Sequence, residues 1–193
     1  MVGIKIALVC FVAVADISGG KAAEANVPEP TPAVVWEAPT EAPTQAPVYV
    51  PPVQEGFVAY RIHGYTPPIE WQQYLYAELE ARGIAWYWPY AVCQIFQESR
   101  WNQYSDNGVD VGLTQQKAVY WQTRAAHWGV PGASIWDPYA QLKVYAGMMA
   151  QYLYISGGSV EWALSWYFWG NGEYAEQYIA DVMAHWSALE AIR

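Results

Sequence analysis

Cysteine, histidine and positive charge are scarce in this chain, and each shortage excludes a class of protein. The two cysteines among 193 residues, Cys10 and Cys93, lie in segments of different character, so a disulfide framework is excluded. The three histidines have no cysteine nearby and no zinc-like spacing, so we predict no metal and no cofactor. Nine basic residues against eighteen acidic ones give a net charge of −9, which excludes nucleic acid as a partner.

The N-terminal 25 residues contain an apolar run that is short for a membrane helix. The run covers residues 6–15, about half of the ~20 residues that span a bilayer. It follows Lys5 and precedes the small-x-small sequence Ala23-Glu24-Ala25, a pattern typical of a secretory signal. We predict that residues 1–25 are a signal peptide or, if uncleaved, an anchor. The protein is then exported, to the periplasm or to the extracellular space.

Residues 26–55 differ in composition from the rest of the chain, because they carry eight of its thirteen prolines. Proline at this density removes backbone donors and favours extended conformations. We predict a disordered, semi-rigid linker; a proline-rich ligand for a partner domain is the alternative. Such a linker is compatible with tethering to an envelope-spanning or virion assembly.

Residues 56–193 are long enough for one domain with a core of its own, which we expect to be monomeric and mainly α. Beyond helices, the pattern leaves room for a short β-hairpin around residues 107–111. Residues 99–112 are rich in Asn, Ser, Asp and Gly, which is typical of a loop. Helical periodicity covers 67–83, a stretch from residue 89 onward, 115–127, 138–155, 160–168 and 174–192.

Glu98 is the candidate catalytic residue, near the end of the second expected helix. It shares a face with the apolar Ala91 and Ile95, which places a carboxylate beside the core. Desolvation and the negative end of the helix dipole both disfavour the charged form, so its pKa should be raised. The alternative from periodicity alone is an exposed helix-end glutamate paired with Arg100.

The residues that follow Glu98 form a spaced series of polar residues and glycines. Further on, an Asp-Pro pair precedes a long helical segment, and an A-L-S-W-Y-F-W-G sequence follows. In order and spacing the chain resembles the lytic transglycosylases of the lysozyme superfamily, closest to the small type associated with secretion systems or phages. The matching positions are Glu98, Ser99, Asn102, Ser105, Asn107, Gly108, Asp110, Gly112, Leu113, Gln115, Asp137, Pro138 and residues 163–170.

The resemblance implies a lysozyme-like helical domain that cleaves the β-1,4 bond between N-acetylmuramic acid and N-acetylglucosamine in peptidoglycan. It makes Glu98 the single general acid and base, first protonating the glycosidic oxygen and then taking a proton from the C6 hydroxyl. The product is a 1,6-anhydro sugar, formed without water. The partner is therefore the peptidoglycan glycan strand.

The resemblance also assigns roles around Glu98. It places Gln115 and Tyr167 in the sugar groove, with the Tyr167 hydroxyl close to Glu98. The chain departs from the family at Phe168, where asparagine is usual, so a groove contact is expected to be lost or supplied elsewhere.

Other residues are expected to brace the loop or to stack on sugar. Ser99 and Asn102 are expected to bond to the loop backbone, where Ser105 and Gly112 also lie. Trp121 and Trp169 are groove candidates, and Trp162 is assigned to the core.

Asp110 defines the main alternative. It could be the second carboxylate of a hydrolytic muramidase, acting with Glu98. We prefer the interpretation that its side chain forms an Asx-type turn. A non-catalytic peptidoglycan-binding module is a further alternative, for which Phe168 is the only support in the sequence.

Overall fold

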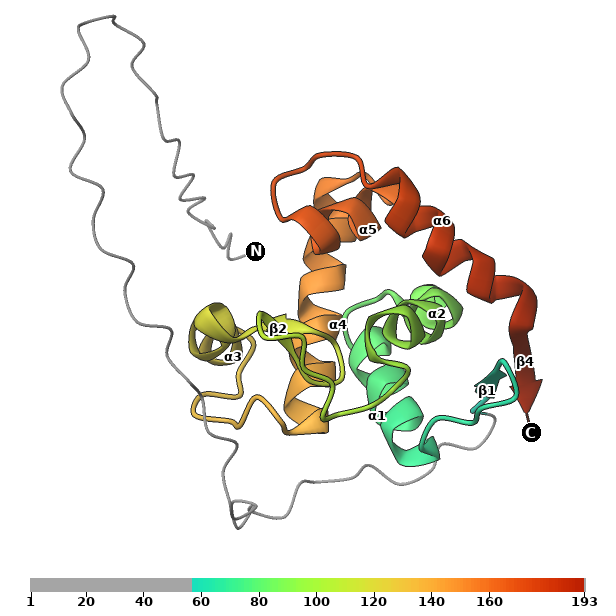
Figure 1. Cartoon of the computed structure of the whole chain (residues 1–193), viewed down its shortest axis with the longest axis horizontal. Helices are drawn as coiled ribbons and strands as arrows, with labels where there is room; N and C mark the ends of the chain where they lie inside the picture. Colours follow the sequence, from blue (N-terminus) through green and yellow to red (C-terminus); the bar gives the residue numbers. More distant parts are fainter. Residues whose placement is uncertain (1–56, 193) are drawn as a thin grey trace, which may run out of the picture. The chain divides into compact units, whose positions relative to one another are not determined.

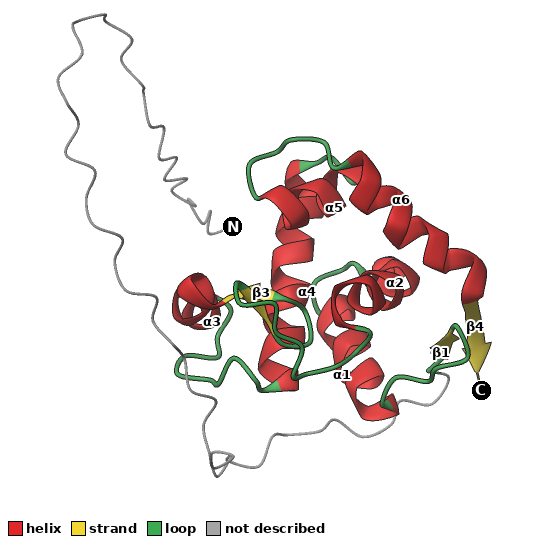
Figure 2. Ribbon diagram, in the orientation of Figure 1, coloured by secondary structure: helices red, strands yellow, loops and turns green. Residues whose placement is uncertain are grey.

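The computed structural model describes residues 57–192, so the predicted signal peptide (1–25), the whole predicted linker (26–55), and the first and last residues of the predicted domain (56 and 193) lie outside the described residues. The described part is mainly helical, with two small two-stranded sheets (Figures 1 and 2). No helix within residues 57–192 combines the length and the apolarity needed to cross a bilayer. The elements are β1 (Ala59–Ile62), α1 (Ile69–Glu80), α2 (Trp88–Ser99), β2 (Asp110–Val111), β3 (Gln116–Lys117), α3 (Trp121–His127), α4 (Pro138–Ile155), α5 (Val160–Trp169), α6 (Glu176–Ala184) and β4 (Leu189–Ile192).

Helix α4 lies at the centre, with the β2–β3 hairpin and α3 on one side and α1 and α2 on the other (Figure 1). It packs directly against α1 and α5. Its start follows from sequence, because Asp137 accepts hydrogen bonds from the backbone N–H groups of Tyr139 (2.9 Å) and Ala140 (3.2 Å), and Pro138 occupies the first helical position. The expected helix at 138–155 is confirmed, as are those matching α1, α2 and α5.

Helix α2 ends abruptly after Ser99. Arg100 and Trp101 both adopt left-handed backbone conformations, with φ of 54° and 61°. The indole of Trp101 is only 2% exposed and donates to the carbonyl of Val92 (3.3 Å), so burial of a large aromatic compensates for the unfavourable backbone. The chain therefore reverses just after Glu98, which leaves that carboxylate at a helix end.

The hairpin is fixed to the helices by side-chain amide and hydroxyl groups. Ser99 Oγ donates to the carbonyl of Leu113 (2.6 Å), which joins the hairpin to the end of α2. Gln141 in α4 accepts from the backbone N–H of Thr114 (2.7 Å) and donates to the carbonyl of Val111 (3.2 Å). The paired strands are 110–111 and 116–117, so the hairpin lies slightly later than the expected 107–111.

The expected helix at 174–192 is wrong in its last third, and so is the expectation that β structure is confined to one hairpin. Helix α6 ends at Ala184, a short 3-10 turn covers His185–Ala188, and the chain then forms β4. Strand β4 pairs antiparallel with β1, joining Ala59 to Ile192. Pairing with a strand 130 residues away in sequence overrides the local helical pattern, which periodicity cannot reveal.

The expected helix at 115–127 starts six residues late, at Trp121. Gln115 has φ of 48°, which a right-handed helix does not allow, and Gln116 lies in β3 with its side chain fully buried. The hairpin therefore takes the residues that the pattern assigned to the first turns of a helix.

Gly112 allows the hairpin to lie very close to the Gln141 side chain of α4. Its φ is +81°, and a Cβ added there would lie 1.7 Å from Nε2 of Gln141. We expect Gly112→Ala to lower the free energy of unfolding by about 3 kcal/mol or more, because it adds a clash to the cost of a left-handed alanine. Urea unfolding of the variant and of the native protein measures this loss in the free energy of unfolding.

Gly108→Ala is the matched control. Gly108 has a similar φ of +88° in the same loop, but nothing lies within 4 Å of a Cβ there. The Gly108→Ala variant should lower the free energy of unfolding by only about 1–2 kcal/mol. Equal losses in the two variants would show that the contact with Gln141 is unimportant.

Candidate active site

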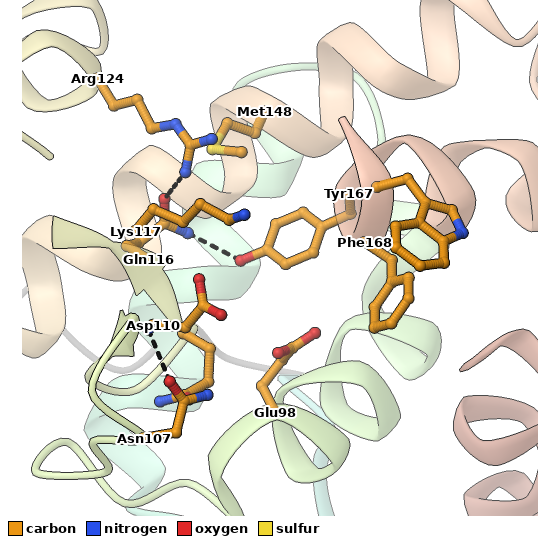
Figure 3. Close-up of a pocket in the computed structure, with 11 residues that line it drawn as sticks. Glu98, Asn107, Asp110, Gln116, Lys117, Arg124, Met148, Tyr167 and Phe168 are labelled. Carbon is orange, nitrogen blue, oxygen red and sulfur yellow. Dashed lines mark hydrogen bonds between the residues drawn. The ribbon is translucent and has the colours of Figure 1, made fainter. Parts of the chain in front are cut away.

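A cleft of about 370 Å³ opens between the end of α2, the hairpin and the end of α5 (Figure 3). It brings together polar, charged and aromatic side chains that are far apart in sequence. Four of the predicted catalytic or substrate-contacting residues lie in it, namely Glu98, Gln115, Tyr167 and Trp169, together with Asp110. Its lining consists of Glu98, Asn107, Asp110, Gln115, Gln116, Lys117, Arg124, Met148, Tyr167, Phe168 and Trp169.

Glu98 is partly buried, and its carboxylate points into this cleft (Figure 3). Desolvation by burial raises its pKa from an ordinary 4.5 to about 7; the nearby charge of Asp110 also raises it, whereas a hydrogen bond from Tyr178 lowers it. At neutral pH the protonated and ionised forms are both populated. Such a carboxyl group can donate a proton and take one back.

Tyr178, which sequence analysis missed, donates its hydroxyl hydrogen to Oε1 of Glu98. The hydroxyl oxygen accepts in turn from Nε2 of Gln94 (3.1 Å). Oε1 of Gln94 accepts from the hydroxyls of Tyr87 (2.8 Å) and Tyr145 (2.7 Å). These buried groups form a chain of hydrogen bonds from the core to the carboxylate, and the chain fixes the direction in which Tyr178 donates.

Phe168, the departure from the family pattern, covers Tyr178. The two rings stack with centroids 4.6 Å apart and an interplanar angle of 21°. Phe168 itself lines the cleft. Phe168 therefore gives the cleft an apolar wall that packs on the residue donating to Glu98, where asparagine would have offered a polar amide.

Asp110 is partly buried and its carboxylate faces the cleft (Figure 3). The preferred interpretation of its side chain as a turn former is wrong, because other residues form the turn. Asn107 Oδ1 accepts from the backbone N–H groups of Val109 (3.0 Å) and Asp110 (2.8 Å), and Asp106 Oδ1 accepts from Gly108 (2.7 Å). The Asp110 carboxylate therefore lines the same cleft as Glu98 rather than forming the turn.

Gln115 lines the cleft, but its amide is engaged by the loop. Nε2 donates to the carbonyls of Gly112 (2.9 Å) and Ser105 (3.3 Å), and Oε1 accepts from Asn107 (3.3 Å). Asn102 is exposed and accepts from the backbone N–H of Tyr104 (3.0 Å). These contacts hold the loop in shape rather than reaching into the cleft.

Tyr167 lies on the wall of the cleft, where it contacts the hairpin. Its hydroxyl donates to the carbonyl of Thr114 (2.5 Å) and accepts from Nε2 of Gln116 (2.8 Å). Oε1 of Gln116 accepts from Nη1 of Arg124 (2.9 Å). Tyr167 lines the same cleft as Glu98, as expected, but the hydroxyl that donates to Glu98 is that of Tyr178.

Of the three tryptophans assigned from sequence, Trp169 lies where it was expected, whereas Trp121 and Trp162 do not. Trp169 is 52% exposed and lines the cleft. Trp121 does not line it, because its ring is 2% exposed in a core cluster and its N–H donates to the carbonyl of Ala133 (2.7 Å). Trp162, assigned to the core, is 44% exposed. Helical spacing could not tell which of these residues the rest of the fold covers.

Sequence reasoning missed Tyr178, Gln116, Lys117, Arg124 and Met148. Tyr178 lies 80 residues from Glu98, so no local pattern connects them. The one available signal was Gln94, a polar residue one helical turn before Glu98 on an otherwise apolar face.

The chain matches no protein-family model, and comparisons with curated proteins and with solved structures find no similar one. Within residues 57–192, no three His, Cys, Asp or Glu side chains are grouped to hold a metal ion. The cleft and the motif residues are therefore the features of this chain that indicate a function.

The raised pKa of Glu98 predicts a pH-dependent cost in stability. As pH rises through 4.5 the unfolded chain ionises, while the folded protein keeps the proton until about pH 7, so stability falls between these values. The pKa difference corresponds to about 3 kcal/mol. Glu98→Gln should therefore match the native protein below pH 4.5 and exceed its unfolding free energy by about 3 kcal/mol above pH 7.

Chemical unfolding at several pH values measures this difference. Glu173→Gln is the control, since Glu173 is exposed and is solvated in both states. A difference between Glu98→Gln and the native protein that does not change with pH would contradict burial of the Glu98 charge.

The hydrogen-bond chain predicts a second effect on Glu98. Tyr178→Phe removes the donor that stabilises the carboxylate, so the pKa of Glu98 should rise further. Gln94→Met should shift it in the same direction by less, since it only frees the Tyr178 hydroxyl. Carbon-13 NMR titration of the carboxyl measures both, with Tyr90→Phe as control. An unchanged pKa in Tyr178→Phe would contradict this network.

Proposed function

We propose that this chain is a peptidoglycan lytic transglycosylase with a lysozyme-like catalytic domain. The observation that carries the proposal is the environment of Glu98: a partly buried carboxyl with a pKa of about 7, directed into an open cleft and held by Tyr178. A glycosidase acid needs a pKa near the working pH. Together with the spacing of the motif from Glu98 to Gln115, this environment favours cleavage of a glycosidic bond.

In the proposed reaction, protonated Glu98 gives its proton to the glycosidic oxygen as the bond from C1 of the muramoyl sugar breaks. The resulting carboxylate is stabilised by the hydrogen bond from Tyr178. It then takes the proton of the C6 hydroxyl while O6 bonds to C1, which closes the 1,6-anhydro ring. Glu98 ends protonated, so the cycle is complete and no water is consumed.

Export to the periplasm or the extracellular space, and tethering through the proline-rich segment to an envelope-spanning or virion assembly, belong to the same proposal. Both are supported only by the composition of residues 1–55. Each fits an enzyme whose substrate is the cell wall.

A hydrolytic muramidase is the second candidate, and the observation that favours it is the position of Asp110. Its carboxylate faces the same cleft as Glu98, and its charge contributes to the raised pKa of Glu98. Hydrolytic enzymes use a second carboxylate as nucleophile or to activate water. In the transglycosylase, Asp110 needs only to influence the pKa of Glu98.

Mass spectrometry of digested purified peptidoglycan tests the proposal. We expect muropeptides with 1,6-anhydromuramic ends, and a loss of activity of at least about a thousandfold in Glu98→Gln, because that variant removes the proposed proton donor. Products with reducing ends alone would establish the muramidase. Release of neither product would leave a binding module.

Asp110→Asn separates the two enzymes by its pH profile. In a transglycosylase it retains activity, but loss of the Asp110 charge lowers the pKa of Glu98, so the alkaline limb of the profile moves to lower pH. In a muramidase it abolishes activity. Asp106→Asn is the matched control, because it removes the same charge from the same loop while keeping the oxygen that accepts from Gly108.

A further inference from the structure

One end of the cleft carries two cationic side chains, Lys117 from β3 and Arg124 from α3. In Figure 3 both lie on the far side of the Tyr167 hydroxyl from Glu98. Within residues 57–192 the ion pairs are Arg61–Glu190 and Arg82–Glu78, so neither cleft cation is paired there. This part of the chain has six basic residues against twelve acidic ones, and yet two of the six face the cleft unpaired.

Arg124 is held in position rather than free to move. Its Nη1 donates to Oε1 of the fully buried Gln116 (2.9 Å), whose Nε2 donates to the Tyr167 hydroxyl (2.8 Å). The guanidinium also lies 5.5 Å from the centre of the Tyr120 ring. One edge of the guanidinium is thus fixed to the wall of the cleft, which leaves its other N–H groups to meet a ligand.

Two unpaired positive charges in a cleft do not favour a neutral sugar over other neutral ligands. They do attract a ligand that carries an anionic group. Over most of this acidic domain a carboxylate is repelled, so the Lys117–Arg124 end is the part of the cleft suited to accept one. A preorganised guanidinium together with the ammonium of the exposed Lys117 is suited to carboxylate recognition.

We propose that the Lys117–Arg124 end of the cleft binds a carboxylate of the muramoyl residue. This carboxylate is either that of the lactyl side chain itself or one belonging to the stem peptide attached to that side chain. This inference rests on the proposed function, which supplies the muramoyl sugar. Glu98 acts on the glycosidic bond at one end of the cleft, and the cations select the muramoyl sugar by its charge at the other. The site therefore discriminates against neutral chitin oligomers, whose backbone has the same β-1,4 linkage.

The test measures ligand affinity in the full chain carrying Glu98→Gln, which prevents cleavage. Three ligands are compared by calorimetry: a muramoyl tetrasaccharide with stem peptides, the same tetrasaccharide without peptides, and neutral chitotetraose. We expect an anionic ligand to be preferred over chitotetraose. Lys117→Ala should reduce this preference about fivefold to tenfold, as should Arg124→Gln.

Lys143→Ala is the matched control, because it removes a lysine of α4 that does not line the cleft. It should leave the preference unchanged. Raising the salt concentration should weaken the anionic ligands more than chitotetraose. The peptide-free ligand shows which carboxylate is bound: an equal response to Lys117→Ala assigns the lactyl carboxylate, and a smaller one assigns those of the peptide.

Two outcomes overturn the inference and they are distinguishable. If all three ligands bind and the preference is the same in Lys117→Ala, Arg124→Gln and the parent chain, the cationic site is refuted while the proposed function stands. If none of the glycans binds, the proposed function fails and the inference fails with it.

Discussion

Burial of the Glu98 carboxyl is the constraint on which the rest of this structure depends. Moving a carboxylate out of water is costly, and here it raises the pKa of Glu98 to about 7. The helix must end at the right residue, which the buried Trp101 ensures, and a donor must stabilise the ionised form, which Tyr178 provides. The domain gives up stability at neutral pH in order to keep a proton available in the cleft.

Buried glutamines connect the parts of the domain around that carboxyl. Gln94 links the core to Tyr178, Gln116 links the hairpin to α5 and α3, and Gln141 links the hairpin to α4. A side-chain amide both donates and accepts, so one residue can satisfy partners from several elements without introducing a charge. A domain with few charged residues thus holds a polar site in place.

The fold was predictable where local chemistry decides it and unpredictable where distant pairing does. The cap at Asp137 and the proline after it define the start of α4, and the apolar face of residues 88–99 defines α2. The end of α6 was predicted wrongly because β4 exists only through pairing with β1. Nothing in the local sequence of residues 185–192 shows that a partner strand is present.

By itself, the sequence determined that Glu98 lies at a helix end beside apolar residues, and that a polar, glycine-containing loop follows it. These properties depend on neighbours within a few turns. Only the tertiary structure decided that Tyr178 donates to Glu98, that Asp110 faces the cleft, and that Trp121 is buried while Trp162 is exposed. Solvation and hydrogen-bond partners are set by residues far apart in the chain, and a carboxyl becomes a proton donor through that environment.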